Sequence, residues 1–251
     1  AFVLALGLCS SAQAQTVYDF SGAHTGNTAF KNTIPSTTVP PTVNTIPSTA
    51  FVAADYTNVS SSDNTRYATG SVGSGSRAAV RYVFTINETP SSLKDLTVDW
   101  EGLAFSGGTV QVYLWNASLA TPAYSLIGST TSSTDVTITS TTTSPANFID
   151  ASSHVTILVV NTSNNAGHST DYVKVTVRRC TANSDCNDNN GCTDDICNPG
   201  TGCTHTNNTA SCADDGIACT NDVCSGGICT HPVAADGTAC SDSNACTPAD
   251  T

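Results

Sequence analysis

The segments Ala79-Val-Arg-Tyr-Val-Phe-Thr-Ile86 and Leu96-Thr-Val-Asp-Trp-Glu101 form one stretch that carries the clearest strand pattern of the chain. In both segments, apolar β-branched, aromatic or leucine side chains occupy every second position. A period of two with these residue types is typical of half-buried strands, because successive side chains of a strand point to opposite faces. The stretch therefore predicts two successive strands, each half-buried.

The same alternation recurs on the C-terminal side of this stretch. Further strands are predicted over residues 110–115, 136–138, 155–159 and 173–177. Turns rich in Gly, Ser, Asn and Pro separate them, and no stretch sustains a period of 3.6 residues. About eight strands in a region of this length predict an all-β fold, a jelly-roll-like β-sandwich. Asn32-Thr-Ile-Pro-Ser-Thr37 recurs as Asn44-Thr-Ile-Pro-Ser-Thr49, and its prolines predict an extended loop or an edge segment.

Composition divides the chain into three regions. Residues 1–14 combine a short apolar run with Ala12-Gln-Ala14, which predicts a partial signal peptide cleaved after Ala14. Residues 15–179 contain every Lys and Arg and no Cys, and we expect them to form the sandwich. Residues 180–251 contain eleven of the twelve Cys and no Lys, Arg, Trp, Tyr or Phe, which predicts a separate cysteine-rich unit.

The net charge of −12 excludes two classes of protein. Nucleic-acid binders neutralise phosphates with clustered Lys and Arg, and polybasic membrane-surface proteins need similar clusters. Apart from the short run before residue 14, no segment is long and apolar enough to cross a bilayer. We therefore expect no transmembrane segment and an extracellular or cell-surface location.

The cysteines of residues 180–251 follow a repeating pattern. They are Cys180, Cys186, Cys192 and Cys197, then Cys203, Cys212, Cys219 and Cys224, then Cys229, Cys240 and Cys246. Corresponding members recur about every 23–28 residues, which is typical of a modular array. In an exported protein this pattern predicts disulfides, and the spacings differ from the paired cysteines of zinc sites although His205 and His231 lie nearby. Because the third unit lacks a fourth Cys, we expect the native chain to continue beyond Thr251.

Oxygen-bearing side chains cluster in the first repeat: Asp185, Asn187, Asp188, Asn189, Asp194 and Asp195. Hard oxygen ligands in a Gly-containing loop suit calcium, so this set is the candidate metal site. These residues are shifted by one position from the D-x-[DN]-x-[DN]-G pattern of calcium-binding loops. The alternative is that these residues only form turns and solvate the array.

Two aromatic residues are candidates for ligand binding. Tyr113 and Trp115 alternate with Val110, Val112 and Leu114, so they face outward if the aliphatic side chains face the core. An exposed aromatic strip would stack on sugar rings; the alternative is that loops cover it. Asp99 and Glu101 share a strand face, which ordinary alternation explains without catalysis.

No nucleophile-elbow, zinc-protease or phosphate-loop motif is present, so we expect no enzymatic activity and no catalytic residues. The segment Asn190-Gly-Cys-Thr-Asp-Asp-Ile-Cys-Asn-Pro-Gly-Thr-Gly-Cys-Thr-His205 resembles the CTDC-type repeats of slime-mould extracellular matrix proteins and of large secreted bacterial proteins. More loosely, residues 15–179 resemble galactose-binding-like jelly rolls in their strand pattern. The resemblance to the CTDC-type repeats implies a secreted matrix or surface protein with structural or adhesive roles. Its expected partners are polysaccharides or matrix proteins. The alternative is a carbohydrate-binding module of a larger secreted protein or enzyme.

Overall fold

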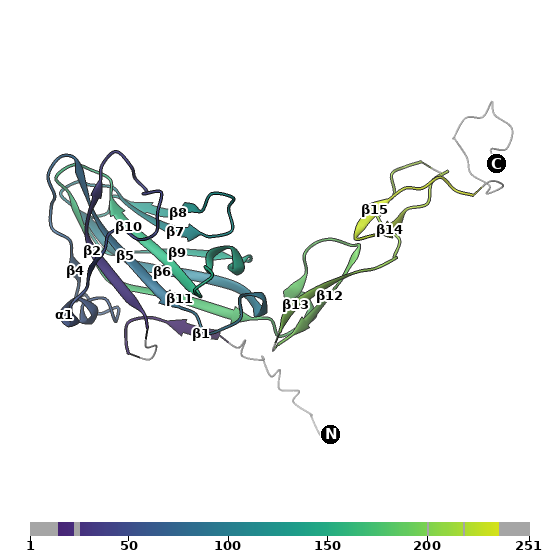
Figure 1. Cartoon of the computed structure of the whole chain (residues 1–251), viewed down its shortest axis with the longest axis horizontal. Coiled ribbons are helices and arrows are strands. Elements are labelled where there is room, and N and C mark those ends of the chain that lie inside the picture. Colours follow the sequence, from purple (N-terminus) through teal and green to yellow (C-terminus); the bar gives the residue numbers. More distant parts are fainter. Residues whose placement is uncertain (1–14, 23–25, 200, 218, 236–251) are drawn as a thin grey trace, which may run out of the picture. The chain divides into compact units, whose positions relative to one another are not determined.

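The computed structural model describes residues 15–22, 26–199, 201–217 and 219–235 (Figure 1). The signal peptide expected over residues 1–14 lies outside them, as do Cys240 and Cys246. The chain divides into two compact units, Ala1–Arg179 and Cys180–Thr251, which we call the sandwich and the tail.

In the described part of the sandwich, the strands form two antiparallel sheets (Figure 1). The five-stranded sheet has the order β1 (Gln15–Tyr18), β11 (Gly167–Arg179), β6 (Leu93–Phe105) and β9 (Val136–Thr142), and β4 (Tyr67–Ala68) also pairs with β11. The six-stranded sheet has the order β3 (Thr49–Ala50), β2 (Thr28–Pro35), β5 (Ser76–Thr85), β10 (His154–Asn161), β7 (Val110–Asn116) and β8 (Ala123–Thr130). The short helices α1 (Ala53–Thr57), η1 (Pro90–Ser92) and η2 (Pro145–Phe148) lie in the connections. The predicted all-β sandwich is confirmed.

The main core lies between the two sheets, and β6 shows how the sequence builds it. Leu96, Val98 and Trp100 are fully buried, whereas the intervening side chains of Thr97 and Asp99 are only partly buried. Each buried aliphatic side chain contributes roughly 1.5–3 kcal/mol, and the larger indole of Trp100 contributes more. The Trp100 indole Nε1–H donates to Thr170 Oγ1 at 2.9 Å, so this large side chain leaves no polar group unsatisfied.

A second apolar cluster covers the outer face of the six-stranded sheet. Its members are Ile34, Ala79, Tyr113, Trp115, Tyr124, Leu158 and Val160. The proline-rich segment 36–48 packs over this cluster through Val39 and Ile46, and Arg81 Nε donates to the Pro47 carbonyl oxygen at 3.1 Å. Strands β5 and β10 are therefore buried on both faces.

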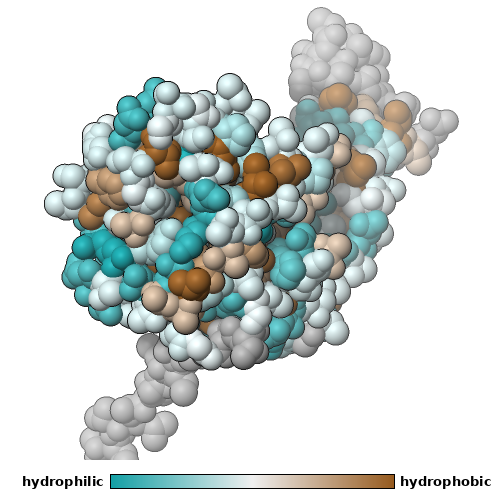
Figure 2. Space-filling model, turned by 60° about the vertical axis from the view of Figure 1, so that its left-hand side comes forward, coloured by the Kyte–Doolittle hydropathy of each residue, from teal (hydrophilic) through white to brown (hydrophobic). Residues whose placement is uncertain are grey.

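Apolar residues are scattered on the one face of the molecule that Figure 2 shows. On the face seen in Figure 2, hydrophobic residues form small patches separated by hydrophilic and neutral ones. Among the described residues, no helix has the length and apolarity to cross a membrane.

The described part of the tail contains two short hairpins and one 3-10 turn, η3 (Asn183–Cys186). The first hairpin pairs β12 (Thr193–Asn198) with β13 (Gly202–Asn207), and the second pairs β14 (Val223–Ser225) with β15 (Ile228–Thr230). Gly226 and Gly227 form the turn of the second hairpin with φ values of +64° and +81°. Positive φ at both central residues is what a tight two-residue hairpin turn requires, and glycine adopts it without strain.

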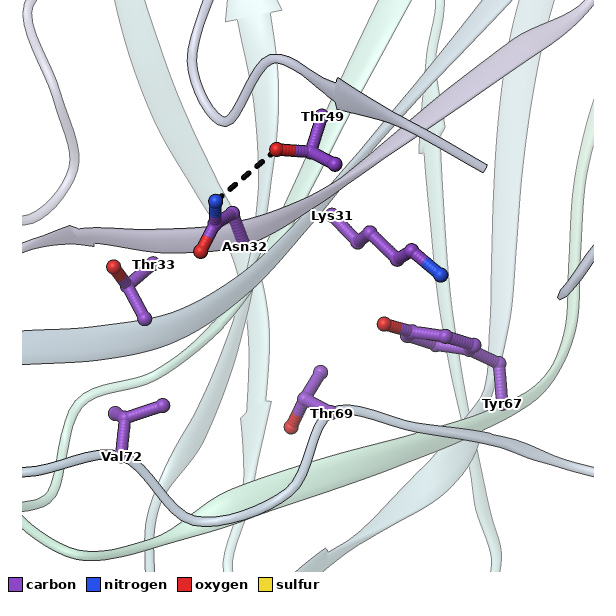
Figure 3. Close-up of a pocket in the computed structure, with 7 residues that line it drawn as sticks. All are labelled: Lys31, Asn32, Thr33, Thr49, Tyr67, Thr69 and Val72. Atoms are coloured by element: carbon purple, nitrogen blue, oxygen red, sulfur yellow. Dashed lines mark hydrogen bonds between the residues drawn. The ribbon is translucent and has the colours of Figure 1, made fainter. Parts of the chain in front are cut away.

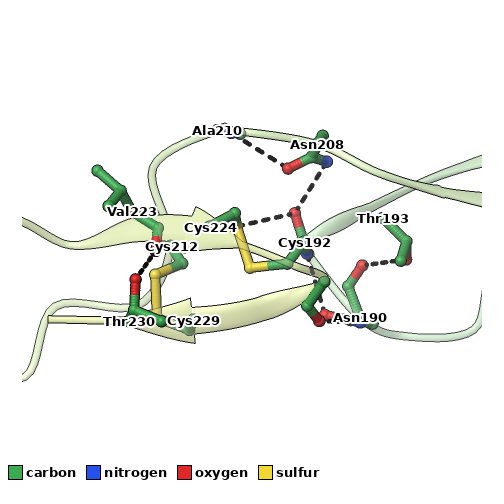
Figure 4. The surroundings of a disulfide bond; sticks show 12 residues. Asn190, Cys192, Thr193, Asn208, Ala210, Cys212, Val223, Cys224, Cys229 and Thr230 are labelled. Carbon is green, nitrogen blue, oxygen red and sulfur yellow. Dashed lines mark hydrogen bonds between the residues drawn. A yellow bond between two sulfur atoms is a disulfide. The ribbon is translucent and has the colours of Figure 1, made fainter.

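Disulfides link these hairpins. Cys186–Cys203 and Cys212–Cys229 each join residues 17 apart, as does Cys180–Cys197. Cys192–Cys224 spans 32 residues and joins the two repeats (Figure 4). Cys219 is disulfide-bonded as well.

The disulfide prediction is thus confirmed for the described cysteines, and the zinc alternative is wrong for them. The grouping of the cysteines into units needs correction, because Cys203 pairs with Cys186 of the group before it. Cross-links take the place of a core here: large aliphatic side chains such as Ile217, Ile228 and Val233 remain exposed.

Candidate functional site

Tyr113 and Trp115 lie on the outer face of the six-stranded sheet, as predicted, but they are not accessible. Only 6% of Tyr113 and 8% of Trp115 is exposed. Tyr124 packs edge-on against Trp115 with ring centroids 5.0 Å apart, and segment 36–48 covers the cluster. The expectation of an exposed aromatic strip is therefore wrong. The reason is that the proline-rich segment folds back over the sheet instead of projecting as a loop.

An accessible cleft lies instead at the other end of this sheet, beside β2 (Figure 3). It encloses about 300 Å³ and is lined by Lys31, Asn32, Thr33, Thr49, Tyr67, Thr69 and Val72. Strands β2 and β3 supply one wall, and β4 with the segment after it supplies the other. We call these seven residues the cleft.

Hydroxyl and amide groups dominate the cleft. The Asn32 side-chain amide donates to Thr49 Oγ1 at 3.1 Å, which leaves its carbonyl oxygen as an acceptor (Figure 3). Among the described residues, the hydroxyls of Thr33 and Tyr67 have no hydrogen-bond partner. Such groups both donate and accept, so the cleft offers several hydrogen bonds to a ligand that carries hydroxyls.

The one cationic side chain that lines the cleft is already paired. Lys31 Nζ lies 2.6 Å from Asp55 Oδ2 and 5.5 Å from the centroid of the Tyr67 ring. Burial, with a smaller contribution from Asp55, raises the pKa of Tyr67 to about 12, so its phenol stays neutral. The cleft therefore presents almost no net charge to a ligand.

Two features hold the cleft in shape. The Tyr67 ring packs against Phe51, with centroids 4.6 Å apart, so its position is fixed. Asn32 has φ of +145°, a conformation that residues other than glycine rarely adopt. Such backbone is found preferentially at functional sites. The Asn32 amide bonds Thr49 Oγ1, which links β2 to β3 beside the cleft.

The sequence did not single out any residue of the cleft. Its walls come from residues 31–33, 49 and 67–72, which are brought together only by pairing of β2 with β3 and of β4 with β11. The one available signal was the proline-rich repeat over residues 31–50, which contains four of the lining residues.

The candidate calcium residues of the tail are mostly occupied in turns. Asp185 accepts hydrogen bonds from the backbone N–H groups of Thr181 and Ala182, Asn187 accepts one from Asn189, and Asp194 accepts one from the Asn208 amide. The turn alternative thus describes these residues well. Calcium binding by the full set of six stays a prediction.

Of the six candidate calcium residues, only Asp188 and Asp195 lie close together. Both face His205, which the sequence did not identify as a candidate. The Nδ1 atom of His205 lies 2.6 Å from Asp195 Oδ1 and 3.4 Å from Asp188 Oδ2. The second repeat has the same arrangement in Asp215, Asp222 and His231. The matching positions in the two repeats were the signal that could have identified it.

A further group of carboxylates lies in the sandwich. One ligand atom each from Glu101, Asp135 and Asp171 lies within 4.8 Å of the others. Desolvation by burial, followed by the charges of Glu101 and Asp135, raises the pKa of Asp171. The sequence predicts that Glu101 shares a strand face with Asp99, and both lie on the same face of β6. Asp99 interacts with Thr139 and Lys174, however, and does not join this group.

Solved structures with a similar arrangement of strands exist, at low identity. The CBM22-1 xylan-binding domain from Paenibacillus barcinonensis Xyn10C matches with a TM-score of 0.34 and 8% identity, covering 68% of this chain and 98% of that one. A xylan-binding domain from CBM 22 gives 0.35 and 11%, covering 68% and 99%, and the xylan-binding module CBM15 gives 0.28 and 14%, covering 47% and 93%. No curated protein matches the chain.

One family model matches more than half of the chain. It is AF_1625_C, described as "Uncharacterized protein, C-terminal domain", and it covers residues 24–179, nearly the whole sandwich. The chain belongs to this family.

Proposed function

We propose that the sandwich is a carbohydrate-binding module that holds a neutral polysaccharide in the cleft. The observation that carries the proposal is the composition of the cleft: three threonine hydroxyls, one amide, one tyrosine and a lysine whose charge is paired. The proposal does not rest on Tyr113 or Trp115, which are buried.

The cleft residues match the two chemical features of a sugar ring. The hydroxyls of a sugar both donate and accept hydrogen bonds, which Asn32 and Thr33 can satisfy. The C–H face of the ring is apolar and packs well against an aromatic side chain, for which Tyr67 is available. A few placed polar groups beside an apolar surface are typical of small-ligand sites.

Charge argues for a neutral ligand. Lys31 is paired with Asp55, and the pKa of Tyr67 is raised, so no free charge lines the cleft at neutral pH. An anionic polysaccharide would gain little attraction from the cleft and would meet a chain whose net charge is −12.

We further propose that the protein is extracellular and non-catalytic, and that the tail is a protease-resistant spacer. The disulfides support an oxidising compartment. Because Cys192–Cys224 joins two repeats, unfolding of one hairpin is restricted by the other. In this proposal the protein has a matrix or adhesion role, and its sandwich contacts polysaccharide.

Retention of the full chain on insoluble polysaccharides tests the proposal. Cellulose, chitin and insoluble xylan serve as probes; xylan is included because of what the similar solved structures are described to bind. We expect at least one to retain the wild type, and Thr33→Trp, which fills the cleft from an exposed position, to reduce retention at least tenfold.

Tyr67→Ala removes the aromatic ring of the cleft and should also reduce retention, and Tyr172→Ala is its matched control. Tyr172 is also a half-buried tyrosine, but it lies on β11 and its hydroxyl bonds Asp19. Retention lost in the Tyr67 and Thr33 variants but kept in the Tyr172 variant supports the proposal. Retention lost only in the Tyr172 variant, or no retention of the wild type on any probe, overturns it.

A further inference from the structure

The carboxylates of Glu101, Asp135 and Asp171 are brought together by strand register in the five-stranded sheet. Glu101 lies on β6 directly opposite Tyr172 of β11, and the register shifts between Thr170 and Tyr172, so Asp171 occupies a bulge beside it. Asp135 immediately precedes β9, whose first residue pairs with the residue after Glu101. Three acidic groups from three segments thus converge at one place, which we call the acidic cluster.

The innermost carboxylate of the acidic cluster has an unsatisfied oxygen. Asp171 is only 1% exposed. Its Oδ2 atom accepts a hydrogen bond from the backbone N–H of Asn64 at 3.1 Å, whereas its Oδ1 atom is buried and has no partner in the described structure. A buried carboxylate oxygen without a partner is costly, and native proteins rarely leave one.

Nearby cations do not balance the charge of the acidic cluster. Arg66 donates from Nε to Asp135 Oδ1 at 3.0 Å and also contacts Asp135 through Nη2. Among the described residues, neither Glu101 nor Asp171 forms an ion pair within 4 Å. Three carboxylates facing one guanidinium leave an excess of two negative charges if all are ionised.

We propose that Glu101, Asp135 and Asp171 bind a divalent cation, with Asp171 Oδ1 as the inner ligand. Its two positive charges would balance the excess, and its coordination would satisfy the orphaned oxygen. Carboxylate oxygens suit hard cations. One oxygen from each carboxylate lies within 4.8 Å of the others, so all three can bind one ion. Calcium accepts an irregular set of oxygen ligands, whereas magnesium demands a near-ideal octahedron and gives up its waters reluctantly, so the acidic cluster favours calcium.

The site differs from the calcium candidate in the tail and is independent of the cleft. It would tie the segment around Asn64 and Arg66 to strands β6 and β11, so its occupancy should stabilise the sandwich. Both tryptophans of the chain, Trp100 and Trp115, lie in the sandwich. Their fluorescence therefore reports unfolding of this unit whatever happens in the tail.

The test is thermal unfolding of the full chain, followed by tryptophan fluorescence after EDTA treatment, with added CaCl2 or MgCl2. We expect calcium to raise Tm by about 5–10 °C at a hundredfold excess over its Kd. Magnesium should need higher concentrations. No rise with either cation in the wild type overturns the proposal.

Variants locate the effect. Asp171→Asn and Glu101→Gln should abolish the calcium-dependent rise, each without a change in side-chain size. Asp99→Asn is the matched control, because Asp99 lies on the same face of β6 and this substitution removes the same charge. The Tm of this variant should still rise with calcium. A rise that persists in both cluster variants places the cation elsewhere. If the wild type shows no rise with calcium and Asp171→Asn is at least as stable as the wild type in EDTA, a proton, not a metal, neutralises this group.

Discussion

Replacing Trp115 with alanine distinguishes a buried aromatic cluster from an exposed binding strip. An aromatic side chain removes roughly 150–250 Å² from water when buried. At ~25 cal/mol per Å², the side chain contributes about 4–6 kcal/mol, and Trp115 is only 8% exposed. Segment 36–48 can partly relax into the space, so we expect Trp115→Ala to lower the free energy of unfolding by about 3–5 kcal/mol.

Denaturant unfolding followed by fluorescence measures this loss, because Trp100 remains as the reporter in the core. Iodide quenching of the wild type gives a second readout, and both tryptophans should be protected until the sandwich unfolds. A loss below about 1 kcal/mol, together with free quenching of one tryptophan, would refute the burial of Trp115 and restore the exposed strip.

Three further predictions concern the two units. Gly102→Ala should lower the free energy of unfolding by about 1–3 kcal/mol or more, because the added Cβ would meet a backbone carbonyl of β11 and the Trp100 ring; Gly73→Ala, where nothing lies within 4 Å, should change it little. The double variant Cys192→Ser/Cys224→Ser should lose about 3–4 kcal/mol of stabilisation in the tail, seen as faster cleavage by thermolysin; unchanged cleavage would contradict a cross-linked spacer. Burial lowers the pKa of His168 to about 3, so below about pH 6.5 the unfolded chain binds a proton that the folded chain excludes. The free energy of unfolding therefore falls as the pH drops from about 6.5 towards 3. Between pH 7 and pH 5 we expect it to fall by about 2 kcal/mol more in the wild type than in His168→Leu.

The alternating strands could be predicted because each depends on local pattern. The segments around Val80, Val98 and Val112 have one apolar face, and that face lies in the core in every case. The faces of Tyr113 and Trp115 were also predicted correctly. Their burial could not be, because it depends on a segment more than sixty residues earlier in the chain.

The repeated hexapeptide shows why local sequence was insufficient. Its first copy, residues 32–37, begins within strand β2 and pairs with β5, whereas its second copy, residues 44–49, lies mostly in the covering loop. The same six residues thus adopt different structures because different neighbours surround them. The cleft depends on this difference, since β2 and β3 form one of its walls.

The disulfide pairs and the acidic cluster were beyond prediction for a related reason. Cysteine spacing is compatible with many connectivities, and the observed pairs cross the groups suggested by the repeat. Asp171 joins the acidic cluster only through a bulge in β11, which no local pattern announces.

Whether a neutral sugar occupies the cleft can be measured by an NMR titration of the isotope-labelled full chain. Xylohexaose and cellohexaose are the soluble probes. If the sugar binds there, we expect saturable shifts of the backbone amides of residues 31–33 and 67–72, with little change around Tyr172 or in the tail. Shifts confined to the outer face of the five-stranded sheet around Tyr172, or no shift with either oligosaccharide, would contradict it.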